Sequence, residues 1–141
     1  MRVALLKHIL IEPVPLPAFL HPMNSEARIQ AESFKWFWNH YPEYRRLLFH
    51  IPNGGKRTTL EASRFKAMGV VAGVPDLFLA VPANGYHGMF IEVKKHGEKP
   101  RPEQKNQMAL FAQNGYYCVY VDSIELFEMV VKIYLNGTEP G

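Results

Sequence analysis

The sequence predicts an α/β domain in which helices flank a mixed β-sheet. Segments with helical periodicity alternate with short apolar segments of strand composition, in the order αβαββαβα. The 141 residues suffice for one domain, and 48% of them are hydrophobic, which is typical of a globular chain. A second independent core is therefore not expected.

Two helices and one strand are predicted in the first half of the chain. Ser25 is a suitable N-cap for a helix that ends near Pro42, because proline disrupts a helix interior. Residues 46–51 (Arg-Leu-Leu-Phe-His-Ile) predict a short strand that stops at the Pro-Asn-Gly-Gly turn, 52–55. A second helix is expected over residues 59–68, with Gly69 at its C-terminal end.

The second half of the chain contains a predicted hairpin followed by a helix, a strand and a helix. Pro102 suits the first turn of the first of these helices, Gly115 stops it, and Ser123 caps the last one. The turn at 82–85 joins the two hairpin strands. The predicted ranges are 76–81 and 88–94 for the hairpin, 102–114 for the helix, 116–121 for the third strand and 124–135 for the last helix.

Residues 1–24 are predicted to form an extended arm preceding the main domain, residues 25–141. Four of the chain's eleven prolines lie at positions 13, 15, 17 and 22, which excludes a regular helix or a central strand there. The arm is too apolar to remain solvated. It either packs on its own domain or contacts a second subunit, and we expect the dimer contact.

Composition excludes several classes of protein. A single cysteine, Cys118, cannot form an internal disulfide, and six scattered histidines lack the spacing of a zinc site. These features predict a reduced, cytoplasmic protein in which Cys118 is a buried small side chain. No apolar run reaches the roughly 18 residues of a membrane helix, and no signal peptide is evident. The phosphate-binding loop of ATPases is missing, so no nucleotide cofactor is expected.

Charge is distributed unevenly along the chain, although the net charge is only +3. Residues 26–75 carry eight Lys and Arg against four acids, whereas residues 106–141 carry one against four. A second basic cluster contains Lys94, Lys95, Lys99, Arg101 and Lys105. This pattern permits a polyanionic partner such as nucleic acid without requiring one.

Two carboxylates and a lysine are predicted to meet at one end of the hairpin. Glu92 and Lys94 are two residues apart, so their side chains share one face of a strand. Asp76 begins the neighbouring strand, with fifteen residues between it and Glu92. Charged groups beside an apolar sheet are costly unless they have a purpose.

Metal-assisted phosphodiester hydrolysis is the chemistry that suits this trio. Mg²⁺ is bound through one or two carboxylates and keeps positions for water and phosphate. A bound metal acidifies water, and a lysine can stabilise charge in the transition state. The structural alternative is a turn residue at Asp76 and a solvated ion pair between Glu92 and Lys94.

The longer pattern resembles a known family. Pro75-Asp76 followed by Glu92-Val93-Lys94 is similar to the signature of PD-(D/E)XK nucleases. Gly73-Val74-Pro75-Asp76-Leu77, together with the Pro-Asn-Gly-Gly turn, Gly69 and Gln104, resembles the VRR-NUC branch of that superfamily. The resemblance covers about residues 25–135 and implies a restriction-endonuclease-like core.

The resemblance also implies roles for single residues. Asp76 and Glu92 match the metal-binding acids, Val93 would offer its backbone carbonyl to the metal, and Lys94 matches the catalytic lysine. Gln104 matches a glutamine that contacts the lysine or phosphate, and a solvated position is its alternative. Mg²⁺ is the implied cofactor, and Mn²⁺ is expected to substitute for it.

Glu26 is a further candidate for the catalytic set, and other residues are candidates for contact with the DNA. Glu26 matches an acid on the first helix, although an acid in a first turn also has a helix-dipole explanation. Gln30 lies one turn later on the same face. Asn53 belongs to a turn that can approach DNA phosphates or be merely structural. The remaining predicted DNA-binding residues are Lys56, Arg57, Lys95, Lys99 and Arg101.

The resemblance implies a Mg²⁺-dependent endonuclease that acts on branched DNA. The resemblance implies that single-domain members cut four-way (Holliday) junctions as homodimers, and a two-fold dimer would match the symmetry of a junction. Two alternatives stay open: a nuclease for flaps or single-strand ends, and a DNA-binding module without turnover.

Overall fold

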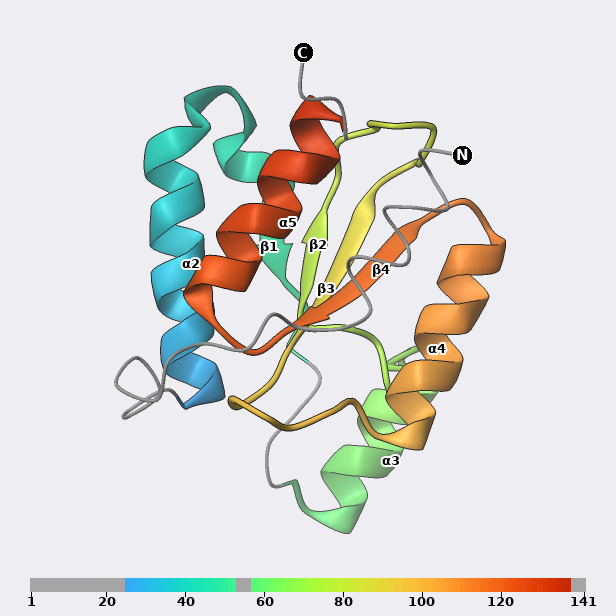
Figure 1. Cartoon of the computed structure of the whole chain (residues 1–141). Coiled ribbons are helices and arrows are strands. Elements are labelled where there is room, and N and C mark those ends of the chain that lie inside the picture. Colours follow the sequence, from blue (N-terminus) through green and yellow to red (C-terminus); the bar gives the residue numbers. More distant parts are fainter. Residues whose placement is uncertain (1–24, 53–56, 138–141) are drawn as a thin grey trace.

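The structure is a computed structural model that describes residues 25–52 and 57–137 of the chain (Figure 1). The predicted arm, 1–24, and most of the turn at 52–55 lie outside the described residues. The elements are α2 (Glu26–His40), η2 (Pro42–Leu47), β1 (Leu48–His50), α3 (Thr59–Ala67), β2 (Leu77–Leu79), β3 (Met89–Val93), α4 (Pro102–Gln113), β4 (Tyr117–Val121) and α5 (Ile124–Asn136).

A four-stranded mixed sheet forms the centre of the domain, in the order β1-β2-β3-β4. Strand β2 pairs antiparallel with both β1 and β3, and β4 pairs parallel with β3. Helices α2 and α5 pack together over one face, and α4 covers the other face beside β4 (Figure 1). The predicted mixed sheet flanked by helices is therefore confirmed.

Side-chain alternation divides the sheet residues between these two layers. Leu77 pairs with Ile91, and both are fully buried on the face that carries α2 and α5. Phe90 lies on the opposite face and stacks on Phe111 of α4, with ring centroids 3.9 Å apart. Glu92 follows Phe90 by two residues, so its carboxylate points to the α4 side of the sheet.

Local capping explains where the helices begin. The Ser25 hydroxyl accepts a hydrogen bond from the Arg28 amide at 3.2 Å, and the Ser123 hydroxyl accepts one from Leu126 at 3.1 Å. Both caps were expected from the sequence. The inner face of α5 ends on Tyr134, whose hydroxyl donates to the Val81 carbonyl at 2.6 Å.

The strand predicted over residues 46–51 is shorter than expected. Residues 42–47 form the 3₁₀ helix η2, and the strand begins only at Leu48. Pro42 occupies the first turn of η2, where its fixed φ is favourable. Arg45 stabilises the turn by donating from Nε to the Trp38 carbonyl at 2.8 Å.

None of the described helices is both long and apolar enough to cross a bilayer.

Candidate active site

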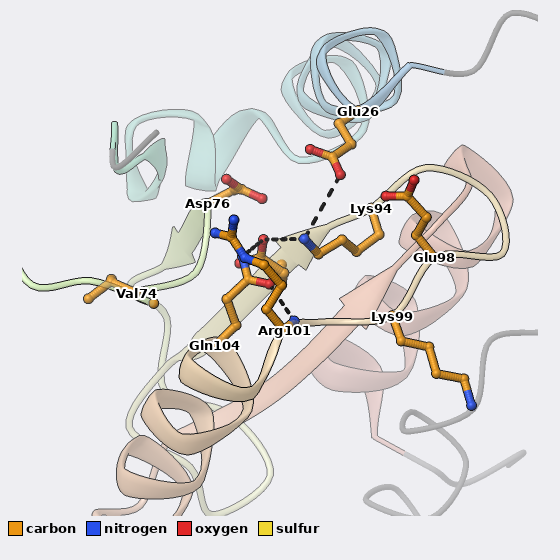
Figure 2. A pocket seen from close by; sticks show the side chains of 10 residues that line it. Glu26, Val74, Asp76, Lys94, Glu98, Lys99, Arg101 and Gln104 are labelled. Carbon is orange, nitrogen blue, oxygen red and sulfur yellow. Dashed lines mark hydrogen bonds and ion pairs between the residues drawn. The ribbon is translucent and has the colours of Figure 1, made fainter. Parts of the chain in front are cut away.

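A charged cavity of about 420 Å³ lies where β2 begins and β3 ends, next to the N-termini of α2 and α4 (Figure 2). It brings together side chains from five separate segments of the chain. The lining residues are Glu26, Gly73, Val74, Asp76, Glu92, Lys94, Glu98, Lys99, Arg101 and Gln104.

Asp76 connects three strands at this end of the sheet. Its carbonyl accepts a hydrogen bond from the Ile51 amide at 2.7 Å, which continues the pairing of β1 with β2. Its Oδ2 accepts a hydrogen bond from the Val93 amide at 2.8 Å, which holds the carboxylate against the end of β3. The predicted meeting of Asp76 with Glu92 and Lys94 in one cavity is present.

Glu92 is a buried carboxylate with one satisfied oxygen. The residue is 3% exposed, and its Oε1 accepts a hydrogen bond from Gln104 Nε2 at 2.8 Å. Its Oε2 is buried and has no hydrogen-bond partner within the described part of the chain. Burial, and secondarily the neighbouring Asp76 carboxylate, raise the pKa of Glu92 to about 8. The site therefore disfavours a bare negative charge on Glu92.

Lys94 supplies a buried positive charge beside these acids. The residue is 7% exposed, and its Nζ lies 3.9 Å from Glu92 Oε1. The same nitrogen lies 4.0 Å from Glu26 Oε1, in the first turn of α2. Glu26 was an uncertain candidate in the sequence, and the structure places it at the rim of the cavity, facing Lys94 (Figure 2).

Gln104 contacts Glu92, whereas the sequence suggested Lys94, phosphate or solvent. The residue is 7% exposed, so it is not a solvated position. Its Oε1 accepts a hydrogen bond from the Arg101 amide at 2.8 Å, which leaves the Nε2 amide to donate to Glu92. The start of α4 therefore fixes the amide orientation that Glu92 needs.

Gly73 allows the loop before Asp76 to pack on α4. Its φ is +85°, and a Cβ atom at this position would lie 2.5 Å from the Glu103 carbonyl oxygen. Both observations require glycine. This close approach presses the loop that leads into Asp76 against the first turn of α4, which carries Gln104.

Gln30 lies outside the cavity and contacts a histidine that the sequence analysis left without a role. Gln30 Nε2 is 2.9 Å from His50 Nδ1, and His50 Nδ1 is also 2.8 Å from the Asp76 carbonyl oxygen. The Nδ1 atom can accept from Gln30 or donate to the carbonyl, but not both at once. His50 was missed because it contacts main chain rather than a charged group.

The predicted DNA-binding residues are dispersed around the site. Lys99 and Arg101 line the cavity, while Lys95 is exposed next to Lys94 without lining it. Arg57 lies apart from the cavity, with its Cζ 4.1 Å above the Phe65 ring. Asn53 and Lys56 lie outside the described residues.

The residues present fit one hard divalent cation. Asp76 and Glu92 offer carboxylate oxygens, and Glu92 Oε2 has no hydrogen-bond donor among the described residues, whereas Lys94 lies 3.9 Å from Oε1. The Val93 amide points toward Asp76, and the carbonyl of a strand residue faces the same side as its amide. No set of three or more His, Cys, Asp or Glu side chains within 25–52 and 57–137 forms a metal cage. That is compatible with Mg²⁺, which retains water and phosphate ligands.

The loop after β3 is fixed by an acid that the sequence analysis did not single out. Asp122 is 1% exposed, its Oδ2 accepts from the Gly97 amide at 3.0 Å, and the same oxygen lies 3.4 Å from His96 Nδ1. This loop carries Glu98, a further missed residue that lines the cavity. In the sequence, Asp122 precedes Ser123 and is indistinguishable from an ordinary turn residue before a helix cap.

Cys118 is only partly buried, whereas the sequence predicted a buried side chain, but its thiol has the inert character expected of it. Burial raises the pKa of its thiol to about 12, so the thiolate is scarce near neutral pH. The thiol lies near α4, on the face of the sheet opposite α5, and lines a separate apolar cavity. It is not part of the candidate active site.

Comparison with known proteins agrees with this geometry. The family model described as "VRR-NUC domain" matches residues 25–123. A solved structure titled "VRR_NUC domain protein" is 30% identical, with a TM-score of 0.70, covering 79% of this chain and 88% of that one. A second, titled "VRR_NUC domain", is 20% identical with a TM-score of 0.47, covering 77% of this chain and 96% of that one. No curated protein matches the sequence. The chain therefore belongs to the VRR-NUC domain family, a nuclease family of the PD-(D/E)XK superfamily.

Proposed function

We propose that this protein is a metal-dependent endonuclease that hydrolyses phosphodiester bonds in DNA. The observation that supports this most is the buried Glu92 carboxylate, with one unpartnered oxygen, beside Asp76 and Lys94. A buried carboxyl group beside a second carboxylate is costly to ionise unless a cation lies between them. Because the chain belongs to a nuclease family, we interpret this arrangement as a metal-binding catalytic site.

Asp76, Glu92 and the Val93 carbonyl are the groups that would hold Mg²⁺, with Mn²⁺ as a substitute. When bound, the metal lowers the pKa of a water molecule and neutralises charge on the scissile phosphate. Glu92 must lose its proton to act as a ligand, so metal binding is expected to release protons. Gln104 keeps Glu92 Oε1 in place during this exchange, because its own amide is fixed by the Arg101 backbone.

Lys94 is placed to act on the reacting phosphate. Its ammonium nitrogen lies 3.9 Å from Glu92 Oε1 and 4.0 Å from Glu26 Oε1, about 1 Å beyond hydrogen-bond distance from each. From there it can orient the attacking water or donate to the phosphate oxygens as negative charge builds up. Glu26 restrains the ammonium from the side of α2. Lys99 and Arg101 add positive charge at the rim, where the DNA backbone enters.

Branched DNA, with four-way junctions foremost, is the proposed substrate, cut by a homodimer. The described residues contain one catalytic set, so two incisions on one junction need two copies of the chain or two encounters. A two-fold dimer would present two sites with the symmetry of the junction. A nuclease for flaps or single-strand ends is the second candidate.

The deciding experiment compares three labelled substrates of matched sequence: a four-way junction, a flap and a linear duplex. Each is incubated with the full-length protein in Mg²⁺, Mn²⁺ or EDTA, and the products are resolved on denaturing gels. We expect metal-dependent cleavage that is fastest on the junction and absent in EDTA. Faster flap cleavage would favour the second candidate. Binding without cleavage in either metal would reject the nuclease assignment.

A further inference from the structure

Helix α3 forms without contributing to the hydrophobic core. None of its residues is buried. Its start is stabilised locally, since the Thr58 hydroxyl accepts from the Glu61 amide at 3.2 Å and Glu61 Oε2 accepts from the Thr58 amide at 3.1 Å. A short helix that packs so little gains little from tertiary contacts. Its side chains are therefore available for another task.

A cavity of about 550 Å³ separates α3 from the start of α4, which lies beside it in Figure 1. We call this cavity the α3 groove. It shares Gly73 and Arg101 with the active-site cavity, so the two cavities adjoin. The lining residues are Arg57, Ala62, Phe65, Lys66, Gly69, Val70, Val71, Ala72, Gly73, Arg101 and Glu103.

The α3 groove combines cations with an apolar floor. Its charged lining consists of three cations, Arg57, Lys66 and Arg101, and one acid, Glu103. The Glu103 carboxylate lies 3.5 Å from Arg101 Nε. Within 25–52 and 57–137, neither Arg57 nor Lys66 has an acidic partner. The floor between them is made by the Phe65 ring and by small aliphatic side chains.

We propose that the α3 groove binds an unpaired DNA strand that continues from the scissile phosphate. The proposal rests on the nuclease function proposed above and adds to it a determinant of substrate choice. Single strands are bound by cations that follow the backbone and by aromatic or apolar surfaces that contact the exposed bases. A duplex keeps its bases stacked inside and would leave the apolar floor without a partner. A groove that adjoins the active-site cavity therefore suits DNA whose strands separate near the cut.

The test measures DNA binding without cleavage. Full-length protein in EDTA is titrated into a fluorescein-labelled oligothymidine of about 12 nucleotides and, separately, into a hairpin duplex, and the anisotropy is recorded over a range of salt. The groove variant combines Arg57→Ala with Lys66→Ala. The control variant, Lys35→Ala with Arg46→Ala, removes the same charge from exposed positions that line neither cavity.

The groove variant is expected to bind the oligothymidine about tenfold more weakly, with a salt slope smaller by about 1.4 for two lost phosphate contacts. Its affinity for the duplex should fall by less, and the control variant should stay within about twofold of the parent on both probes. Phe65→Leu keeps an apolar side chain but removes the ring. It should weaken oligothymidine binding without changing the salt slope.

Three outcomes would overturn the proposal. Equal losses in the groove and control variants would mean that only net charge matters. Unchanged oligothymidine binding with a smaller mass by light scattering would make the groove a contact between copies of the chain. A larger loss on duplex than on single strand would assign it to paired DNA. Cleavage by the unmodified protein is assayed separately, so a failed groove and a failed nuclease assignment remain distinguishable.

Discussion

The Glu92 carboxyl group combines deep burial with a close like charge. The pKa of Glu92 is raised to about 8 by burial first and by Asp76 second, and only Lys94 opposes this. A second carboxylate so close to a buried carboxyl group disfavours its ionisation unless a positive charge lies between them. The free-energy cost of burying Glu92 beside Asp76 is explained if a divalent cation binds to both carboxylates in the active enzyme.

Removal of either acid should abolish cleavage and leave DNA binding intact. Asp76→Ala and Glu92→Ala each delete a predicted metal ligand, while the cations that contact phosphate remain. Glu98→Ala is the matched control, since Glu98 lines the same cavity outside the acid pair. Cleavage rates and anisotropy titrations on one junction substrate provide the measurement. Near-normal cleavage by either acid variant would show that the metal is bound elsewhere.

The role of Lys94 in turnover should be experimentally separable from the role of the acids in metal binding. Lys94→Ala is expected to bind Mn²⁺ in calorimetry and yet to lose turnover by a factor of at least about 10², the usual scale for one positioned electrostatic group. The reason is that Lys94 contacts Glu92 and Glu26 only at 3.9 Å and 4.0 Å, so the ligand oxygens do not depend on it for hydrogen bonds. A loss of metal affinity equal to that of Glu92→Ala would instead make Lys94 a support for the ligands.

The raised pKa of Glu92 also predicts how stability depends on pH. Without metal, the folded protein retains the Glu92 proton up to about pH 8, whereas the unfolded chain releases it near 4.5. The unfolded state therefore binds fewer protons in this window, and the free energy of unfolding should fall as pH rises through it.

Thermal unfolding in EDTA at about pH 5 and about pH 9 measures this effect. The Glu92→Gln variant, which keeps the acceptor for Gln104 but cannot ionise, should lose less stability between the two. Added Mg²⁺ should restore stability to the unmodified protein at the higher pH and do little for the variant. Identical pH dependence in the two proteins would contradict the assignment.

At the scale of elements, the loop before β2 is locked to α4 by a single glycine. Gly73→Ala should lower the free energy of unfolding by at least about 2 kcal/mol, because a positive φ and an overlap with main chain both oppose the methyl group. Gly97→Ala is the matched control, since its φ is +81° but nothing lies within 4 Å of the added atom. It should cost only about 1 kcal/mol.

Urea denaturation of both glycine variants gives the comparison. Gly73→Ala should also reduce cleavage, because the loop that carries Asp76 and the helix that carries Gln104 move apart. Equal losses of stability would mean that only the backbone conformation matters. Full cleavage by a destabilised Gly73→Ala protein would separate this loop from the geometry of the site.

Elements with strong local signals were predictable from the sequence, and those set by tertiary contacts were not. Ser25 and Ser123 are caps whose hydrogen bonds form within one turn, so both helix starts could be located. The strand predicted over 46–51 lost its first residues to η2, where Arg45 reaches back to the Trp38 carbonyl. No local pattern contains that contact.

The candidate site was likewise predictable from the sequence only where local pattern determines it. Alternation along β3 placed Glu92 and Lys94 on one face, and the turn length allowed Asp76 to reach them. The partner of Gln104, the bond between His50 and the Asp76 carbonyl, and the support from Asp122 each join elements that are distant in sequence. Glu92 and Gln104 were candidates, but their mutual hydrogen bond was not foreseen, and His50 and Asp122 are residue types common in turns that nothing in the sequence singled out.

For the molecule as a whole, the proposed cut on both sides of a junction needs a second copy of the chain or a second encounter. The described residues bury their core around one sheet and present one catalytic cavity. The apolar arm, residues 1–24, is the segment that we expect to provide the contact between copies. Its ten apolar side chains within positions 3–20 are more than a solvated tail carries.

Deletion of residues 1–22 should convert a dimer into a monomer by light scattering while leaving the circular dichroism spectrum of the domain intact. Junction cleavage should fall further than the nicking of a simple duplex, because paired incision depends on two sites held together, whereas a nick needs one. Both activities should fall equally if the arm instead packs on its own domain and the deletion only destabilises it. A full-length protein that stays monomeric at micromolar concentration, free and on junction DNA, would reject the dimer. The flap nuclease would then be the better explanation, since one site suffices for a single cut.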